Sequence, residues 1–146
     1  MAIDGSASEN VLEYCPCYTP NALMRALIDR YIDAYNLKDV KAMLLTMHGD
    51  VVFENYTAGN LGLRTPGVEE LRHLAESSRH LFSARRQTIT AYHQDADTAY
   101  AKIFFEGTFA VDLPNGVRAG QSIAMNGRSE FRERDGLLIY IADHSD

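Results

Sequence analysis

Residues 122–144 read SIAMNGRSEFRERDGLLIYIADH, and this stretch decides the fold. Apolar residues alternate with polar ones in much of the stretch before Asp135-Gly136 and fill both sides of the stretch after it, and both patterns are typical of β-strands. An Asp-Gly pair between two runs of this kind is among the strongest short signals for a tight hairpin. We therefore expect two antiparallel strands, near 117–131 and 137–144, that meet at this turn.

The same alternation predicts which side chains of the hairpin face the protein interior. The more apolar side of the first strand holds Ile123, Met125, Gly127, Ser129 and Phe131. Both sides of the second strand carry apolar residues, and we expect Ile139, Ile141 and Asp143 to face inward. A two-residue turn between the strands then places Ser129 close to Asp143.

An aspartate that faces an otherwise apolar interior has a chemical consequence. Burying an unpaired carboxylate costs free energy, and the pKa of the group rises as a result. A carboxylate with a raised pKa in a pocket is suited to act as a general base near neutral pH. Asp143 is therefore a candidate base, and the alternative is a solvated, inert carboxylate near the end of the chain.

The first half of the chain has the helical period instead. Thr19 and Pro20 supply an N-cap and a first helical residue, and apolar residues then recur at helical spacing. Asp39 is expected to cap a second, shorter helix that ends at residues 48–50. A third helix is expected from about 68 to 82.

Helices that precede a run of strands predict the α+β class, with the helices packed on one face of a curved sheet. Three further strands are expected, at 51–55, 87–94 and 98–110. Residues 57–67 are expected to form a loop, and Asn115-Gly116 to form a second hairpin turn. Residues 1–19 are interpreted as an N-terminal extension, and 20–146 as a single domain.

Composition limits which binding partners and which cellular location are expected for this protein. The chain has 146 residues, of which 46% are hydrophobic and 23% charged, as in a globular protein with one domain. A net charge of −6 disfavours nucleic acid and anionic membranes as partners. Without a signal-peptide pattern or a span of ~20 apolar residues, a cytoplasmic location is expected. Cys15 and Cys17 are too few for a zinc site, and no metal or organic cofactor is expected.

Several short stretches carry a resemblance to a known family. They are Tyr31-Ile32-Asp33-Ala34-Tyr35-Asn36 followed by Asp39, Asp50-Val51-Val52-Phe53, Phe104-Phe105-Glu106-Gly107-Thr108, Phe131-Arg132-Glu133-Arg134-Asp135-Gly136 and Asp143-His144-Ser145-Asp146. In order and spacing they resemble the SnoaL-like branch, the polyketide cyclases, of the nuclear-transport-factor-two-like superfamily. This resemblance covers the residues from about 20 to 146. It implies a cone-shaped, curved, mostly antiparallel sheet wrapped around three helices, with a cavity between sheet and helices.

The resemblance also implies roles for particular residues. SnoaL-like cyclases use an aspartate of the last strand to remove a proton from an activated carbon, and Asp143 matches its position. Tyr31, late in the first helix, and Asn55, ending the first strand, match cavity positions of the superfamily. Ser129 stands where the cyclases have an assisting histidine. Ketosteroid isomerases have carboxylates at the Asn55 and Ser129 positions, so the resemblance disfavours a steroid isomerase.

Two functional hypotheses follow. The first is a cofactor-independent lyase, isomerase or cyclase that removes a proton next to the carbonyl of a small apolar molecule. Asp143 would be its base, while Tyr31 and Asn55 stabilise the enolate oxygen. The second is a non-catalytic module of the same fold that binds a small ligand or dimerises. The residues expected to contact the substrate are Ser129, Phe53, Met125, Ile141, Phe131 and Leu27.

Three further expectations concern other parts of the chain. A dehydratase of the same superfamily needs an Asp-His pair, for which Asp29 and His80 are rough candidates. The edge that holds Arg85 and Arg86 is expected to be solvated. The strand at 98–110 carries apolar residues on both sides, so its outer face is expected to form a homodimer. Those apolar residues are Ile103 and Phe105 on one side, and Phe104 and Tyr100 on the other.

Overall fold

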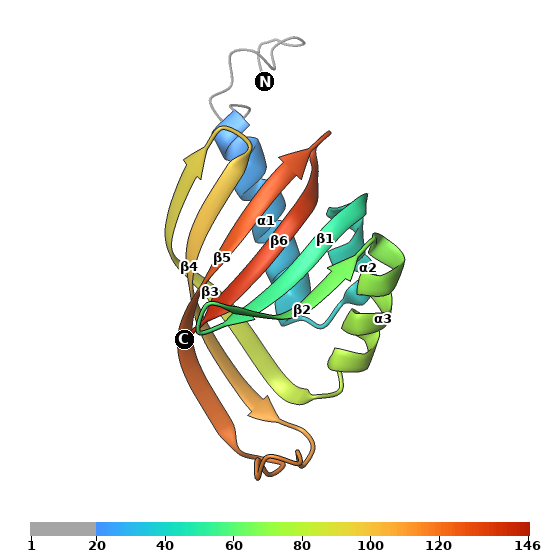
Figure 1. Cartoon of the computed structure of the whole chain (residues 1–146), viewed down its shortest axis with the longest axis vertical. Helices are drawn as coiled ribbons and strands as arrows, with labels where there is room; N and C mark the ends of the chain where they lie inside the picture. The colour runs from blue at the N-terminus through green and yellow to red at the C-terminus, as the bar shows by residue number, and fades with distance from the viewer. Residues whose placement is uncertain (1–19) are drawn as a thin grey trace.

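The computed structural model describes residues 20–146, which form three helices and a six-stranded sheet (Figure 1). The elements are, in order, α1 (Pro20–Asn36), α2 (Val40–Leu45), β1 (Met47–Thr57), β2 (Asn60–Pro66), α3 (Val68–Ser78), β3 (Phe82–Asp95), β4 (Thr98–Phe109), β5 (Ser122–Arg134) and β6 (Leu137–Ser145). The strand order is β2-β1-β6-β5-β4-β3. β1 and β6 run parallel and the other neighbours are antiparallel, so the predicted α+β class is confirmed.

The helix starts follow the predicted signals. α1 begins at Pro20, and the Asp39 carboxylate accepts a hydrogen bond of 3.1 Å from the backbone N–H of Ala42 at the start of α2. None of these helices has the length and apolar character that crossing a bilayer requires. The expected extension over 1–19, with its two cysteines and the Thr19 cap, lies outside the described residues.

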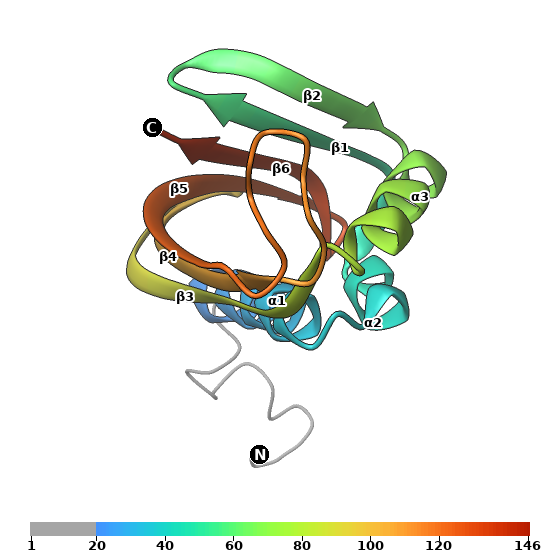
Figure 2. The ribbon, with the colours of Figure 1, turned by 90° about the horizontal axis from the view of Figure 1, so that it is seen from below.

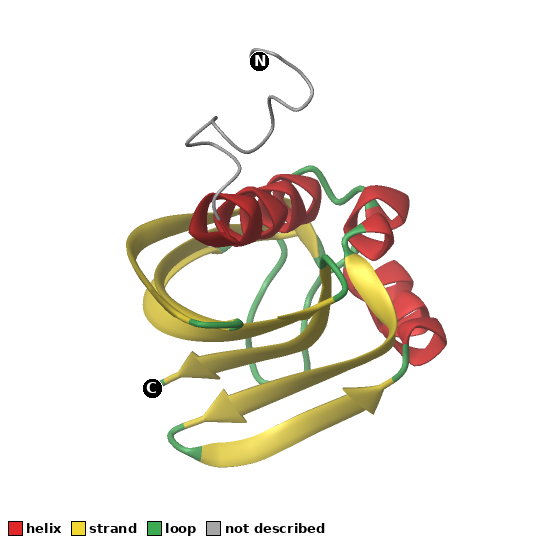
Figure 3. Ribbon diagram, turned by 90° about the horizontal axis from the view of Figure 1, so that it is seen from above, coloured by secondary structure: helices red, strands yellow, loops and turns green. Residues whose placement is uncertain are grey.

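The sheet curls, and the helices gather along one side of it. Figure 2 shows β3, β4 and β5 bending around a common centre, and Figure 3 shows the helices together on one side of the strands. α1 packs against β3 and β6, whereas α3 packs against β1 and β2. This arrangement is the curved sheet that the sequence pattern predicted and the cone that the family resemblance implied, and it leaves the inner face of β1, β6 and β5 opposite the helices.

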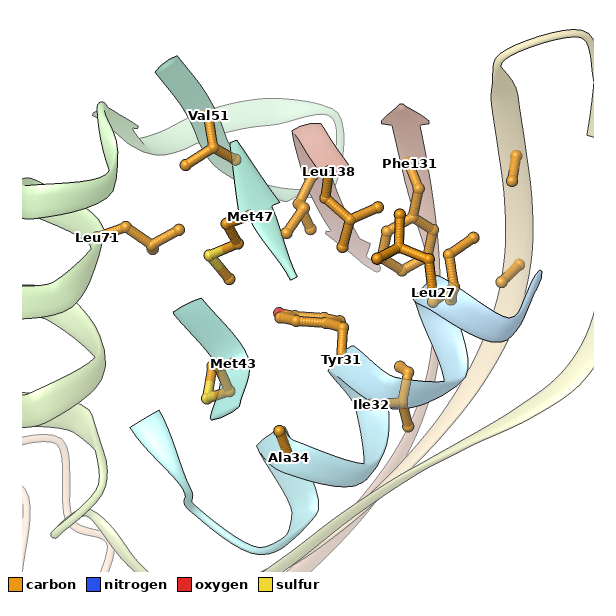
Figure 4. Packing of buried hydrophobic residues seen from close by; sticks show 14 of the residues in the cluster. Leu27, Tyr31, Ile32, Ala34, Met43, Met47, Val51, Leu71, Phe131 and Leu138 are labelled. Carbon is orange, nitrogen blue, oxygen red and sulfur yellow. The ribbon is translucent and has the colours of Figure 1, made fainter. Parts of the chain in front are cut away.

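One face of α1 fills the centre of the core. Its buried side chains are Met24, Leu27, Ile28, Tyr31 and Ile32, which recur at helical spacing. The sheet contributes Phe131, Leu138 and Ile141, none of which has exposed surface. Figure 4 shows Leu27 and Tyr31 of α1 beside Phe131 and Leu138 of the strands. Burial of apolar surface stabilises at roughly 25 cal/mol per Å², so this cluster is the main source of stability.

The β5–β6 hairpin forms at the predicted Asp135-Gly136 turn. Their φ angles are 56° and 78°, as a two-residue turn with both residues in the left-handed region requires. Beyond the turn the pairing slips, and Ile139 has no register partner on β5. Leu138 is therefore fully buried while Ile139 is half-buried, which corrects the expectation that Ile139 faces inward.

Residues 57–67 were expected to be a loop, and this prediction is wrong. Most of the stretch is β2, which pairs with β1 through a two-residue turn at Ala58-Gly59. Both turn residues have positive φ, 51° and 81°. β2 lies at the sheet edge, where only Thr65 is buried, so it lacks the alternation that marks a half-buried strand.

Other boundaries also differ from the predicted ones. Asn115-Gly116 turns the chain inside a longer connection, 110–121, and β5 begins five residues later than expected, at Ser122. α3 ends at Ser78 rather than near 82, so β3 starts earlier than predicted. β1 likewise begins at Met47 and takes in residues 48–50, where the second helix was expected to end.

Candidate functional site

Three polar residues form a row across neighbouring strands. Asn55 of β1 is the register partner of Asp143 of β6, and Asp143 is the partner of Ser129 of β5. Register partners place their side chains on the same face of a sheet. The Ser129 hydroxyl donates a hydrogen bond of 2.6 Å to Oδ1 of Asp143. The predicted closeness of these two residues is confirmed, and it depends on the bulge that shifts their register.

This row borders a cavity between the sheet and the helices. The cavity has a volume of about 290 Å³, and Asp143, Asn55 and Tyr31 all line it. Apolar side chains make up much of the remaining wall, among them Met43, Met47, Phe53, Leu63, Leu71, Leu74 and Phe82. A second hollow of about 180 Å³ shares Asp143 and Asn55 with it and is lined by Ser129. The fold thus brings the predicted polar residues to one mostly apolar cavity.

Two larger hollows border the same curved sheet, and Arg85 lines the first while Ser129 lines the second. One, of about 460 Å³, is bordered by exposed Arg86 and Glu106, and the other, of about 410 Å³, by exposed Lys102 and Arg128. Neither is lined by Asp143. We therefore place the candidate site at the smaller cavity, because ligand sites combine apolar walls with a few converging polar groups.

Desolvation sets the chemistry of Asp143. It raises the pKa of the carboxyl from an ordinary 3.8 to about 6, while the hydrogen bond from Ser129 acts in the opposite direction. Among residues 20–146, Ser129 is the sole side chain that donates to this carboxylate, and it uses Oδ1. Oδ2 therefore remains available, on a group that is ionised at neutral pH and still basic enough to take a proton.

Tyr31 reaches the cavity from α1. Figure 4 shows its ring extending from the helix toward Met47, with the hydroxyl at the far end. The residue is 4% exposed, and burial together with the nearby Asp143 charge raises the pKa of the phenol. The hydroxyl therefore stays protonated and is a donor. It has no hydrogen-bond partner within the described part of the chain, which leaves it available to a ligand.

Sequence reasoning missed Arg85, which was expected on a solvated edge. This residue is 9% exposed and lines the cavity, whereas its neighbour Arg86 is exposed as expected. The Arg85 guanidinium carbon lies 3.7 Å from the centre of the Tyr35 ring, and its Nε donates to the Tyr35 carbonyl over 3.0 Å. Alternation back from Gln87 would have placed Arg85 inward, but the predicted strand began too late to include it.

The structure separates the residues expected to contact the substrate. Phe53 lines the main cavity and Met125 the adjoining hollow, where Met125 remains 40% exposed. Leu27, Phe131 and Ile141 lie in the packed core and line neither space.

The alternative Asp-His pair does not come together at the cavity. Asp29 forms an exposed ion pair of 3.0 Å with Arg25, and His80 is exposed. Neither residue lines the cavity. Across residues 20–146, no three His, Cys, Asp or Glu side chains gather as a metal site would require.

Comparison with known proteins agrees with the fold. The model of the SnoaL-like domain family matches residues 28–141. A protein assigned as a polyketide cyclase from Xanthomonas campestris pv. campestris is 20% identical, with a TM-score of 0.71 over 85% of this chain and 90% of its own. A second such protein, from a Silicibacter species, is 26% identical, with a TM-score of 0.66 over 84% and 88%.

A structure with a different assigned activity is similar as well. The LEH-like epoxide hydrolase of M. tuberculosis is 14% identical, with a TM-score of 0.67 over 83% of this chain and 80% of its own. At that identity the likeness shows the fold alone. No curated protein matches the sequence.

Proposed function

We propose that this chain, which belongs to the SnoaL-like family, is an enzyme that removes a proton from a carbon next to a carbonyl. The observation that carries the proposal is Asp143, a carboxylate of raised pKa in an apolar cavity. Tyr31 and Asn55 line the same cavity with groups that can donate hydrogen bonds. A base beside two donors is the arrangement that proton abstraction next to a carbonyl needs.

The proposed reaction begins when the substrate carbonyl binds between the two donors. Oδ2 of Asp143 takes the proton from the adjacent carbon, and the electron pair of that bond moves to form an enolate. Negative charge then develops on the carbonyl oxygen, where the Tyr31 hydroxyl and the Asn55 amide stabilise it by hydrogen bonds. Ser129 keeps Oδ1 occupied and so orients the other oxygen toward the substrate.

The enolate carbon can react further in two ways. In an aldol cyclisation it attacks a second carbonyl of the same molecule, and the new alkoxide takes the proton back from Asp143. In an isomerisation Asp143 returns the proton to a different carbon of the enolate. Two similar structures assigned as polyketide cyclases support the first outcome. Both outcomes use only side chains of this chain.

Hydrogen–deuterium exchange tests the proposal without knowledge of the natural substrate. The purified protein is incubated in deuterium oxide with 2-tetralone, a small apolar ketone with acidic C–H bonds beside its carbonyl, and proton NMR follows their loss. We expect the protein to accelerate this exchange and Asp143→Asn to remove the acceleration, because the amide is nearly isosteric but cannot accept the proton. Failure of the wild-type protein to accelerate exchange of 2-tetralone would contradict the proposal.

A non-catalytic ligand-binding module is the second candidate function. It is favoured by Asn55, which is exposed and so does not form a dry oxyanion site by itself. Such a module would bind 2-tetralone, which ligand-observed NMR detects, and leave its exchange rate unchanged in both the wild type and Asp143→Asn.

We also propose that the outer face of the sheet forms a homodimer. Support comes from Tyr100 of β4, which is 48% exposed on that face. Light scattering at micromolar concentration should then give twice the chain mass, and a particle of 16.3 kDa would contradict the proposal.

A further inference from the structure

We infer that Arg85 is an anion-binding subsite of the cavity, and that the ligand it selects is a small carbonyl compound carrying a carboxylate. This inference rests on the proposed function for the reaction, but not for the binding of the anion. It begins with an arginine that is 9% exposed and lines the cavity. A guanidinium keeps its charge in proteins, and buried charges are ordinarily paired.

The Arg85 charge has no carboxylate partner in the part of the chain that the structure describes. Its Nε donates to a backbone carbonyl, and one face of the guanidinium packs on the Tyr35 ring. The terminal nitrogens, Nη1 and Nη2, have no hydrogen-bond partner among residues 20–146. These two nitrogens form the planar fork that binds a carboxylate through two parallel hydrogen bonds.

The backbone around Arg85 is held in place by the end of α1. The Asn36 side chain accepts a hydrogen bond of 2.7 Å from the Gln87 backbone N–H and donates one of 3.1 Å to the Gln87 carbonyl. Lys38 Nζ donates to the carbonyls of Phe82 and Ser83, at 2.8 and 3.1 Å. Arg85 lies between these anchors, and its guanidinium is held by the Tyr35 carbonyl and the Tyr35 ring.

Arg85 and Asp143 line the same cavity from different strands, β3 and β6. The Tyr31 and Tyr35 hydroxyls feel both charges, because Arg85 lowers the pKa of each phenol and Asp143 raises it. The pKa of Asp143, by contrast, responds to desolvation and to Ser129. Both tyrosines line the cavity together with Arg85 and Asp143. A ligand that places its carboxylate at Arg85 would present its other end to Asp143.

A matched pair of probes tests the anion subsite. 2-Naphthoate and 2-naphthamide have nearly the same flat shape and differ in charge, and calorimetry at about pH 8 gives their dissociation constants. We expect the wild-type protein to bind 2-naphthoate roughly 10- to 100-fold more tightly, as charge-assisted hydrogen bonds allow. Equal affinities, a preference for the amide, or binding of neither probe would overturn the inference.

Neighbouring arginines supply the control variants. Arg85→Gln should reduce 2-naphthoate binding to the level of 2-naphthamide, whereas Arg86→Gln, which changes an exposed arginine, should leave the preference intact. If Arg85→Gln does not fold, as judged by circular dichroism, Arg85→Lys keeps the charge and should retain part of the preference. A loss of preference in Arg86→Gln that matches the loss in Arg85→Gln would indicate general surface charge and contradict the assignment.

Asp143→Asn separates this inference from the proposed reaction. The variant should lose hydrogen–deuterium exchange but keep or strengthen the preference for 2-naphthoate, because a like charge has been removed. If the wild type shows the preference without any exchange, the anion subsite holds and the proposed reaction fails. If exchange occurs without the preference, the reaction holds and the subsite fails.

Discussion

Two carboxylates on adjacent strands of this sheet have opposite electrostatic character. Glu54 precedes Asn55 on β1, so its side chain lies on the outer face, while Asp143 of β6 faces the cavity. Glu54 accepts hydrogen bonds from the Tyr140 and Tyr56 hydroxyls, at 2.5 and 3.0 Å, and lies near Arg64. These contacts lower the pKa of Glu54, whereas desolvation raises the pKa of Asp143 to about 6.

The comparison shows that donors, and not the lack of water alone, decide what a carboxylate does. The Glu54 side chain is only 13% exposed, yet two hydroxyls and an arginine compensate for the water it has lost. Asp143 receives one hydroxyl donor. Glu54 is therefore a stable structural charge that joins β1 to β6, whereas Asp143 keeps a raised pKa and one oxygen without a side-chain donor among residues 20–146.

The largest expected effect is on the exchange rate, when the Asp143 charge is removed. Removal of the Glu54 charge is the control. Asp143→Asn should slow the exchange of 2-tetralone by about 10²–10⁴-fold, the usual range for a general base. Glu54→Gln should leave the rate unchanged, since this residue faces away from the cavity. Proton NMR on both variants measures the rates. An equal loss in the two variants would show that the effect comes from the fold and not from the base.

Removing a donor on the cavity side should have a smaller effect. Tyr31→Phe deletes one of two proposed oxyanion donors, and such deletions cost up to roughly 10²–10³-fold in rate. Its unfolding temperature should stay close to that of the wild type, because the hydroxyl has no partner among residues 20–146 to lose. A rate unchanged from the wild type would exclude Tyr31 as an oxyanion donor.

Replacing each of the two carboxylates by an amide should change the free energy of unfolding in opposite directions. The raised pKa of Asp143 adds stability below about pH 4 that is lost as pH rises through about 6, the pKa in the folded state. Asp143→Asn should therefore be more stable than the wild type at about pH 8, by about 1–3 kcal/mol at 1.36 kcal/mol per unit of pKa. Urea unfolding at about pH 8 and at about pH 4 measures this difference, which should disappear at the lower pH.

Glu54→Gln should be less stable at about pH 8, by about 1 kcal/mol, because the tyrosine hydroxyls lose a charged acceptor. Because the pKa of Glu54 is lowered in the folded state, its carboxylate contributes fully to stability at pH values above its ordinary pKa of 4.5. This stability is lost as the pH falls through the pKa of Glu54 in the folded state. The same urea series measures it. Stabilisation by Glu54→Gln, or destabilisation by Asp143→Asn, would reverse the contrast drawn between the two groups.

The smallest expected effect is a displacement of the pH profile. The Ser129 hydroxyl lowers the pKa of Asp143, so Ser129→Ala should raise that pKa and move the rising limb of the exchange rate to higher pH. In the wild type this limb should have its midpoint near the Asp143 pKa, about 6. Exchange rates measured across the range from about pH 5 to 9 give both midpoints. An unmoved midpoint in Ser129→Ala would show that this hydrogen bond does not tune the base.

Local signals explain which elements were predictable. Pro20, Asp39 and the Asp135-Gly136 turn act within a few residues of themselves, so the helix starts and the hairpin could be derived without a structure. The edge strand β2 has almost no buried side, and the bulge at Ile139 depends on how β6 pairs with both neighbours. Neither feature leaves a periodic pattern in the sequence.

The residues of the candidate site also differ in how far local signals predict their positions. Side-chain alternation and the turn type predicted an inward Asp143 within about one residue of Ser129, and the bulge at Ile139 then makes the two residues register partners. The parallel pairing of β1 with β6, which brings Asn55 beside Asp143, and the burial of Arg85 in the same cavity became visible in the folded chain. Strand order and helix docking join residues far apart in the chain, and free energy gained across the whole core selects them. Local alternation can therefore give the inward direction of the Arg85 side chain, but it does not encode which strands and helices share the cavity.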